Sequence, residues 1–325
     1  MKREIKIKFN AFPPYHDPHK QDYYRFLTSR YDVVECDDPD YLIDGGQDFS
    51  HVFYDCVKIL ISSENNTPNF DMYDYAIASC HMEFGDRYLR VPWFAFYPDF
   101  ATMPCRITMS PEELLNRKFC SFVVSNAEFG DPIRRIFFEK LSQYKQVDSG
   151  GLWRNNVGGP VKDKLAFCRG YKFNIAFENS SFDGYTTEKI KDAYVAQTVP
   201  VYYGNQSIAK DFKPESMVRV AGVDDIDRAI EEIKRLDGDD AAYLKMVTAD
   251  CAVESAAEYH RRVEAFLSQI FDREPATARR ICQYGQQQVY RRHLKMVLGL
   301  DYKICQSKLY RFAVGLRGKM RRVRI

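Results

Sequence analysis

The sequence predicts an α/β protein built on parallel sheets. Short apolar strands alternate with helical stretches along most of the chain, which is typical of this class. Hydrophobic residues make up 45% of the 325 residues, enough apolar material for two domains. A β-α-β pattern over residues 172–204 adds the expectation of a right-handed crossover. We place the domain boundary after the proline-bearing segment 91–111, which gives domains at 1–113 and 114–300 and a tail at 301–325.

Each domain has its own series of expected elements, separated by turn signals. In the first domain we expect a helix at 22–29 and strands at 4–9, 31–35, 58–62 and 75–78. In the second we expect strands at 119–126, 172–179 and 198–204, and helices at 132–144, 186–197, 224–236, 240–250 and 253–271.

The densest polar chemistry lies in residues 171–204, YKFNIAFENSSFDGYTTEKIKDAYVAQTVPVYYG. A hydrophobic strand ends at Asn179, and a helix opens at Thr186 with Glu188 and Lys189 in its first turn. Ligands of doubly wound sheets bind at such strand ends, and a helix N-terminus beside a lysine favours an anion such as diphosphate. Glu188 is suited to accept two hydroxyls of a ribose. An equally weighted alternative is structural: Thr186 caps the helix, Glu188 complements its dipole and Lys189 is solvated surface.

This segment resembles the signature of the α-1,3/4-fucosyltransferases, glycosyltransferase family 10, of the bacterial type. The likeness extends to SSENNTPNFDMYDYAIASCHMEFGDRYLRVP at 62–92 and to FVVSNAEFGDPIRRIFFEKL at 122–141. Together these segments cover most of residues 50–220, whereas residues 10–50 match only weakly. The resemblance implies the GT-B fold, with two facing Rossmann-like domains and a cleft between them. It also implies inverting transfer of L-fucose from GDP-fucose.

The resemblance assigns the general base to Glu64. A sugar hydroxyl is a poor nucleophile until its proton is removed, and a carboxylate in a partly desolvated cleft can remove it near neutral pH. Without the resemblance, the favoured interpretation is that Glu64 hydrogen-bonds the turn at 65–68.

The resemblance also assigns the donor site. Arg134 and Lys189 are expected to neutralise the diphosphate of the leaving group. The neighbouring Arg135 leaves the choice between the two arginines open. Glu188 is expected on the ribose, and the remaining donor contacts are expected at Asn179, Tyr185, Ser125 and Asn126. For Ser125 and Asn126 a capped turn is an equally weighted alternative.

Neither a metal nor another cofactor is expected, because the cations just named would replace the divalent metal of other glycosyltransferases. Two aspartate-rich segments, 38–40 and 237–240, superficially resemble a metal clamp, but their turn-like surroundings predict solvated loops. The 9 cysteines are scattered and form no Cys-x-x-Cys pair, which argues against a zinc site.

The acceptor implied by the resemblance is a GlcNAc hydroxyl, linked α-1,3 and/or α-1,4, on an N-acetyllactosamine-type or type-1 glycan. Such products are Lewis antigens, here expected on lipopolysaccharide. Two alternatives remain open: a transferase of the same fold that uses another nucleotide sugar, and a catalytically silent carbohydrate-binding module. Dehydrogenases and kinases are excluded by the absence of G-x-G-x-x-G and of G-x-x-x-x-G-K-[ST] from the sequence.

The C-terminal residues 306–325 hold seven basic and no acidic residues in an amphipathic pattern. This composition is typical of a helix that lies on an anionic membrane surface, with a solvated basic end as an equal alternative. No nucleic-acid partner is expected, because the rest of the chain shows no basic stripe interleaved with aromatics. The sequence has no segment of eighteen apolar residues and opens on a charged stretch. We therefore expect a cytoplasmic protein, and the basic tail leaves peripheral contact with the inner membrane as an open alternative.

Overall fold

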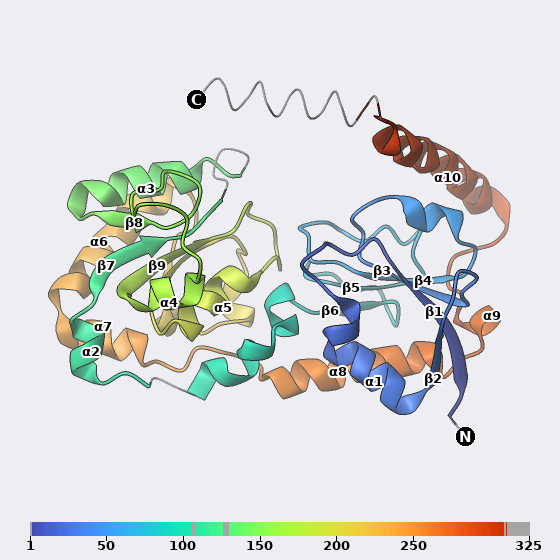
Figure 1. Ribbon diagram of the computed structural model, residues 1–325, viewed down its shortest axis with the longest axis horizontal. Helices are drawn as coiled ribbons and strands as arrows, with labels where there is room; N and C mark the ends of the chain where they lie inside the picture. The colour runs from blue at the N-terminus through green and yellow to red at the C-terminus, as the bar shows by residue number, and fades with distance from the viewer. Residues whose placement is uncertain (1, 106–107, 126–129, 309, 311–325) are drawn as a thin grey trace.

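The computed structural model describes residues 2–105, 108–125, 130–308 and 310, which form two sheets side by side (Figure 1). The first sheet has six strands in the order β2-β1-β3-β4-β5-β6, and the second has five in the order β11-β10-β9-β7-β8. Every strand pair within the two sheets is parallel. Parallel sheets need helices on both faces, and both sheets have them. The expected α/β class is therefore confirmed.

The first sheet is a core of short apolar strands. Its strands are β1 (Glu4–Asn10), β2 (Asp32–Glu35), β3 (Tyr41–Asp44), β4 (Val57–Ile61), β5 (Tyr75–Ala78) and β6 (Tyr88–Arg90). Strands β3 and β6 are not among the strands that the sequence predicts. Helices α1 (Asp22–Arg30) and α8 (Ala256–Phe271) cover one face, and α10 (Gly285–Gln306) lies on the other (Figure 1). Short helical turns complete this half: Pro18–Lys20, Ser50–Phe53, Trp93–Phe96, Pro98–Cys105 and α9 (Pro275–Ala278).

The second sheet contains the predicted β-α-β unit. Its strands are β7 (Lys118–Phe122), β8 (Val147–Ser149), β9 (Tyr171–Phe177), β10 (Val199–Tyr203) and β11 (Val218–Arg219). Its helices are α2 (Pro111–Leu115), α3 (Ile133–Tyr144), α4 (Lys164–Arg169), α5 (Glu188–Val195), α6 (Ile226–Gly238) and α7 (Asp240–Val247). Strands β9 and β10, which flank α5, pair in parallel. The β9-α5-β10 unit therefore lies where the sequence predicts it.

Helix α8 corrects one part of the expected division of the chain. The sequence assigned it to a domain at 114–300, but its apolar face packs into the core of the first sheet. The ring of Phe271 lies 4.7 Å from that of Tyr41, and the ring of Phe266 lies 6.2 Å from that of Tyr75. The amphipathic period of the helix is visible in the sequence, but the period does not say which sheet the apolar face covers.

Helix α10 continues to Gln306, past the expected start of the tail at residue 301. The tip of the Phe53 ring reaches within 3.5 Å of where a Cβ on Gly299 would lie, so the helix packs closely on the turn before β4. Most of the predicted basic tail, residues 309 and 311–325, lies outside the described residues. Among the residues that are described, no helix is long and apolar enough to cross a membrane.

Candidate active site

The two sheets share a topological feature that commonly marks a ligand site. In each, the chain leaves the first strand toward one edge and then returns to build the other edge, so the strand order reverses between β1 and β3 and between β7 and β9. Ligands of doubly wound sheets bind at the carboxyl ends of the strands beside such a reversal. In the second sheet, the loops after β7 and β9 carry the predicted residues Ser125 and Asn179.

A buried carboxylate, Glu178, organises the end of β9. It is fully buried and accepts hydrogen bonds from the Thr187 backbone N–H (2.7 Å) and the Thr187 hydroxyl (2.7 Å). Its Oε2 lies 3.2 Å from Lys189 Nζ. Gly204, with φ +151°, closes the other side, and a Cβ there would lie 2.5 Å from Glu178 Cγ. A side chain at position 204 would therefore displace the carboxylate.

Lys189 is a partly buried cation rather than solvated surface. Its side chain is 19% exposed, and Nζ also lies 3.0 Å from the Thr187 hydroxyl and 3.4 Å from a Glu188 oxygen. Burial opposes the charged form of Lys189, but the charges of Glu178 and Glu188 outweigh burial and raise its pKa. The structural alternative for this helix is wrong at two points. Lys189 is not solvated surface, and the Thr186 hydroxyl does not cap the helix but hydrogen-bonds Asp211 (3.0 Å).

Arg134 projects from α3 into the same strand end. Its Nε donates to the Glu178 carbonyl oxygen (2.9 Å) and its Nη2 to the Phe177 carbonyl oxygen (2.7 Å). Burial lowers the pKa of this guanidinium, opposed by the charge of Glu178. Arg135 points elsewhere and pairs with Glu139 on the helix surface (3.5 Å). The structure thus places Arg134, and not Arg135, at the end of β9.

The remaining predicted donor residues differ in burial. Tyr185 is buried, and its pKa is raised by burial and then by the charges of Glu178, Glu64 and Glu188, so each of these three glutamates lies within electrostatic reach of Tyr185. Burial also opposes ionisation of Glu188, but Lys189 and Lys164 outweigh it and lower its pKa.

Two of the predicted loop residues are exposed. Asn179 and Ser125 both face solvent, and the Asn179 carbonyl accepts the Asp131 N–H (2.8 Å). Asn126 lies outside the described residues. Ser125 and Asn179 thus follow neighbouring strands of the second sheet, exposed at the same end of the sheet as the buried cluster.

Glu64 reaches the site from the other sheet. It follows β4, is exposed, and its backbone N–H donates to the Ser62 hydroxyl (3.2 Å). The adjacent Asn65 amide hydrogen-bonds the Ser180 hydroxyl in the loop after β9, so the carboxyl-end loops of the two sheets touch here. Within the described part of the chain, the Glu64 carboxylate makes no hydrogen bond to the turn at 65–68, which contradicts the structural alternative for this residue.

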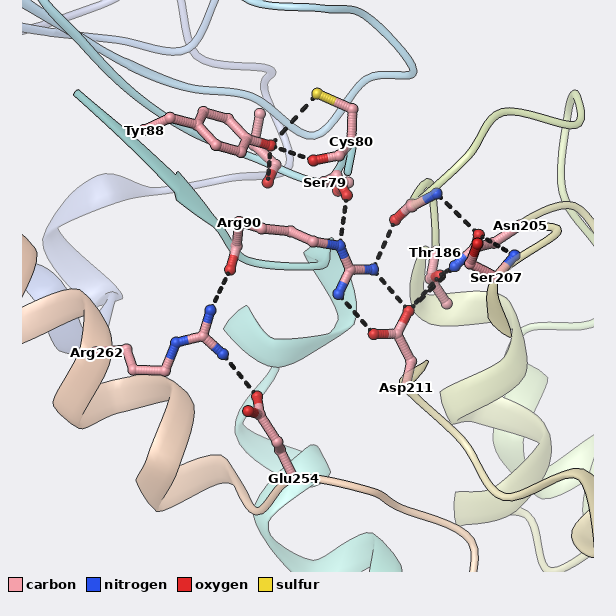
Figure 2. A network of polar contacts seen from close by, with 12 residues as sticks. Ser79, Cys80, Tyr88, Arg90, Thr186, Asn205, Ser207, Asp211, Glu254 and Arg262 are labelled. Atoms are coloured by element: carbon pink, nitrogen blue, oxygen red, sulfur yellow. Dashed lines mark hydrogen bonds and ion pairs between the residues drawn. The ribbon is translucent and has the colours of Figure 1, made fainter. Parts of the chain in front are cut away.

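A buried ion pair joins the two halves of the molecule beside the site (Figure 2). Arg90, at the end of β6, forms a bidentate pair with Asp211 (2.7 and 2.8 Å) and also donates to the Gly184 carbonyl (3.0 Å). The same Asp211 accepts from Thr186 and from the Asn205 amide (3.2 Å). This arrangement, the Arg90–Asp211 pair, therefore fixes both ends of the short loop that carries Tyr185.

Gly184 lets this loop approach the first sheet. Its φ is +86°, and a Cβ would lie 2.4 Å from the Ser79 carbonyl oxygen and 2.6 Å from the His81 backbone nitrogen. Only glycine accommodates both the backbone angle and the contact. Glu178, Arg90 and Asp211 had no role assigned from sequence. Glu178 stands inside the F-E-N motif and could have been found there, whereas Arg90 and Asp211 are separated by 121 residues and carry no local signal.

Fold and site together define the class: a two-sheet α/β protein whose second sheet presents buried cations at its strand reversal, facing a carboxylate from the first. Two family models match the chain, "Alpha-(1,3)-fucosyltransferase FucT N-terminal domain" over residues 7–97 and "Glycosyltransferase family 10 (fucosyltransferase) C-term" over residues 115–289. The chain belongs to glycosyltransferase family 10, which confirms the resemblance seen in the sequence.

Known proteins agree with this assignment. The alpha-(1,3)-fucosyltransferase FucT of Helicobacter pylori is 37% identical over 222 residues, which are 58% of this chain and 46% of that protein. A crystal structure of an alpha1,3-fucosyltransferase has a TM-score of 0.73 at 28% identity and covers 84% of this chain and 91% of the other. Another, determined with GDP-fucose, has a TM-score of 0.70 at 29% identity, covering 84% and 92%. The expected GT-B fold is confirmed, and the chain spans about half the length of the Helicobacter relative.

Proposed function

We propose that the chain is an α-1,3-fucosyltransferase that uses GDP-fucose. The observation that carries the proposal is the cluster of Arg134, Lys189 and Glu178 at the strand reversal of the second sheet. Family membership and similarity to a fucosyltransferase structure with GDP-fucose support the same donor.

Lys189 and Arg134 are proposed to stabilise the diphosphate. As the bond from fucose C1 to the phosphate oxygen breaks, negative charge grows on the leaving group and positive charge grows on the sugar. Glu178 holds Lys189 in place before the donor arrives, since their charged atoms are 3.2 Å apart. Glu188 is proposed on the ribose, and Asn179, Tyr185, Ser125 and Asn126 around the donor.

Glu64 is proposed as the general base. It would take the proton of the acceptor hydroxyl while that oxygen attacks C1 from the face opposite the diphosphate, which inverts the configuration at C1. Its position supports this role, because its loop touches the donor-side loop at Ser180 and its charge acts on Tyr185.

The acceptor is proposed to be a GlcNAc hydroxyl of an N-acetyllactosamine-type glycan. The relatives named above support the α-1,3 linkage. An α-1,4 linkage on a type-1 chain, a Lewis-type product on lipopolysaccharide and contact of residues 306–325 with an anionic membrane remain proposals from the family resemblance and the tail composition. The reaction is proposed to need no metal, because two protein cations lie where the diphosphate is expected.

The test is acceptor-dependent release of GDP from GDP-fucose in EDTA, with N-acetyllactosamine, lacto-N-biose or no acceptor. We expect release with N-acetyllactosamine, and we expect Glu64→Gln to lower kcat by about 10²- to 10⁴-fold while its GDP affinity stays that of the wild type. Glu83→Gln, an exposed glutamate after β5, is the matched control and should retain activity.

Three outcomes would contradict the proposal. Turnover of another nucleotide sugar in place of GDP-fucose would change the donor, and glycan binding without GDP release would favour a silent binding module. Full activity of Glu64→Gln would remove the base from Glu64.

A further inference from the structure

A buried lysine lies far from the candidate active site. Lys58 is the second residue of β4, so it is at the amino end of the first sheet, whereas Glu64 follows the carboxyl end of the same strand. It shares a face with Leu60, whose neighbours are apolar and are covered by α10. The residue is only 4% exposed, and within the described residues its Nζ has no hydrogen-bond or ion-pair partner. Its Nζ reaches solvent only through a pocket, and a charge held this far inside the molecule is costly unless a counter-charge balances it.

Lys58 lines a pocket that is rich in positive charge. The pocket has about 270 Å³ of space unfilled by protein atoms, part of it open to solvent. Its charged lining comes from β4 and its approach, from the residue before β5, from the segment after α9 and from α10: Lys58, Arg279, Arg291 and Lys295 against Asp55 and Asp74. Cations therefore outnumber carboxylates.

The two carboxylates are already engaged. Asp55 pairs with Arg279 (3.0 Å), which lowers the pKa of Asp55. Asp74 accepts three backbone N–H groups, those of Lys58 (2.9 Å), Arg280 (2.7 Å) and Ile281 (2.9 Å). Neither carboxylate contacts the Lys58 ammonium.

The other two cations also lack a carboxylate partner. Arg291 uses its guanidinium on neutral oxygens, the Cys282 carbonyl (2.8 Å) and the Gln283 side chain (3.1 Å). Lys295 is half-buried on α10 and forms no ion pair with any described residue. The pKa of Lys58 is lowered to about 8, first by the burial of Lys58 itself and then by the charge of Lys295. The charges of Asp74 and Asp55 act on these lysines from a distance, but neither carboxylate forms an ion pair with Lys58 or Lys295 within the described residues.

We propose that this pocket binds a small tetrahedral oxyanion, such as phosphate, between Lys58 and Lys295. An oxyanion there would supply the missing acceptor for the buried ammonium and would relieve the repulsion between the two lysines. Because Lys58 belongs to β4 and Lys295 to α10, the bound anion also fastens α10 to the first sheet. The site is independent of the proposed transferase activity.

The experiment is thermal unfolding of the full chain with inorganic phosphate or sulfate, against sodium chloride at equal ionic strength. We expect either oxyanion at about 100 times its Kd to raise the Tm of the wild type by roughly 2 °C or more. Lys58→Met should be at least as stable as the wild type in chloride, because it removes an unpaired buried charge, and should lose the oxyanion increment. Lys295→Met, a change on the half-exposed helix face, should lose most of it and carries the test if Lys58→Met does not fold.

Matched variants separate this pocket from other anion sites. Lys245→Met, on the exposed face of α7, and Lys189→Met, at the candidate active site, should both keep the increment. A phosphomonoester arm with glycerol phosphate distinguishes a free ion from a phosphate group carried on a larger molecule. The proposal is overturned if phosphate and sulfate stabilise the wild type no more than chloride does, or if Lys58→Met and Lys295→Met keep the increment.

Discussion

The strand reversals of the two sheets are alike in topology and differ in chemistry. At the second, Glu178 is surrounded by charged groups, Lys189 and Arg134, that lie at the edge facing the other sheet. At the first, between β1 and β3, Asp44 is fully buried and pairs with neutral groups, the Asn10 amide (2.6 Å) and the Tyr73 hydroxyl. One reversal brings two cations to a buried carboxylate, whereas at the other the buried carboxylate is held by neutral hydrogen-bond donors.

The difference shows that strand order selects a place for a ligand but not the ligand. Both reversals satisfy the same topological rule, yet in the described parts of the chain the cations beside the buried carboxylate, Lys189 and Arg134, are found at the second. The first sheet instead contributes Glu64 from a loop one strand further along. This placement of the cations on the second sheet and of Glu64 on the first agrees with the proposed transferase, in which one sheet binds the donor and the other supplies the base.

Neutralising Glu178 should have the largest effect. Glu178→Gln keeps the shape but leaves Lys189 and Arg134 without their buried counter-charge, and breaking a buried pair costs about 3–5 kcal/mol. Urea unfolding should show this loss, and adding Lys189→Met should recover part of it in a double-mutant cycle. Glu139→Gln, which breaks only surface pairs on α3, should change the free energy of unfolding by less than about 1 kcal/mol. If Glu178→Gln and Glu139→Gln lost equal free energy of unfolding, Glu178 would behave like a surface carboxylate, and the second reversal would not differ from the first in the way described.

Removing the cation at position 189 should act on the donor more than on the acceptor. If Lys189 binds the diphosphate as proposed, Lys189→Met removes charge-assisted bonds worth about 1.5–3 kcal/mol each, so calorimetry should show GDP binding weakened roughly 10- to 150-fold. The KM for the acceptor should stay near the wild-type value. Lys245→Met is the matched control for the loss of one lysine charge. Wild-type GDP affinity in Lys189→Met would contradict the donor assignment.

The parts of the fold that the sequence predicts are those with a strong local pattern. Strand β5 and helix α1 begin where expected, because a buried run bounded by turns and an amphipathic period are both local signals. The six-stranded first sheet is only partly predicted, because the expected strands do not include β3 and β6. The return of α8 to the first sheet is not predicted, since a helix period carries no information about its partner.

The candidate site, like the fold, is predicted from the sequence only where the signal is local. Lys189, Glu188 and Tyr185 are found from one continuous motif, because they share the turn between β9 and α5. The link between Arg90 and Asp211 cannot be found in this way, since it depends on how two sheets meet. Nor does the motif show that Lys189 forms an ion pair with Glu178, because that contact depends on side-chain geometry and not on spacing in the sequence.

The smallest expected effect is a pH dependence at the first reversal. Burial raises the pKa of Asp44 from its usual value near 3.8 to about 6, more than the hydrogen bonds from Tyr73 and Asn10 lower it. The folded chain therefore holds this proton more tightly than the unfolded chain, so the contribution of Asp44 to stability is present below pH 4 and is lost as the pH rises to about 6. Over that window the loss should be about 1–3 kcal/mol.

Asp44→Asn should remove this dependence, because an amide does not titrate. The Tyr73 hydroxyl can accept from the new amide and donate to His51 Nδ1, which lies 3.0 Å away, so the network can be kept. Denaturant unfolding between pH 4 and 6 should thus give a steeper decline for the wild type and for the exposed control Asp38→Asn than for Asp44→Asn. Parallel curves for all three proteins would mean that Asp44 does not change its protonation state between pH 4 and 6, which would contradict a pKa raised by burial.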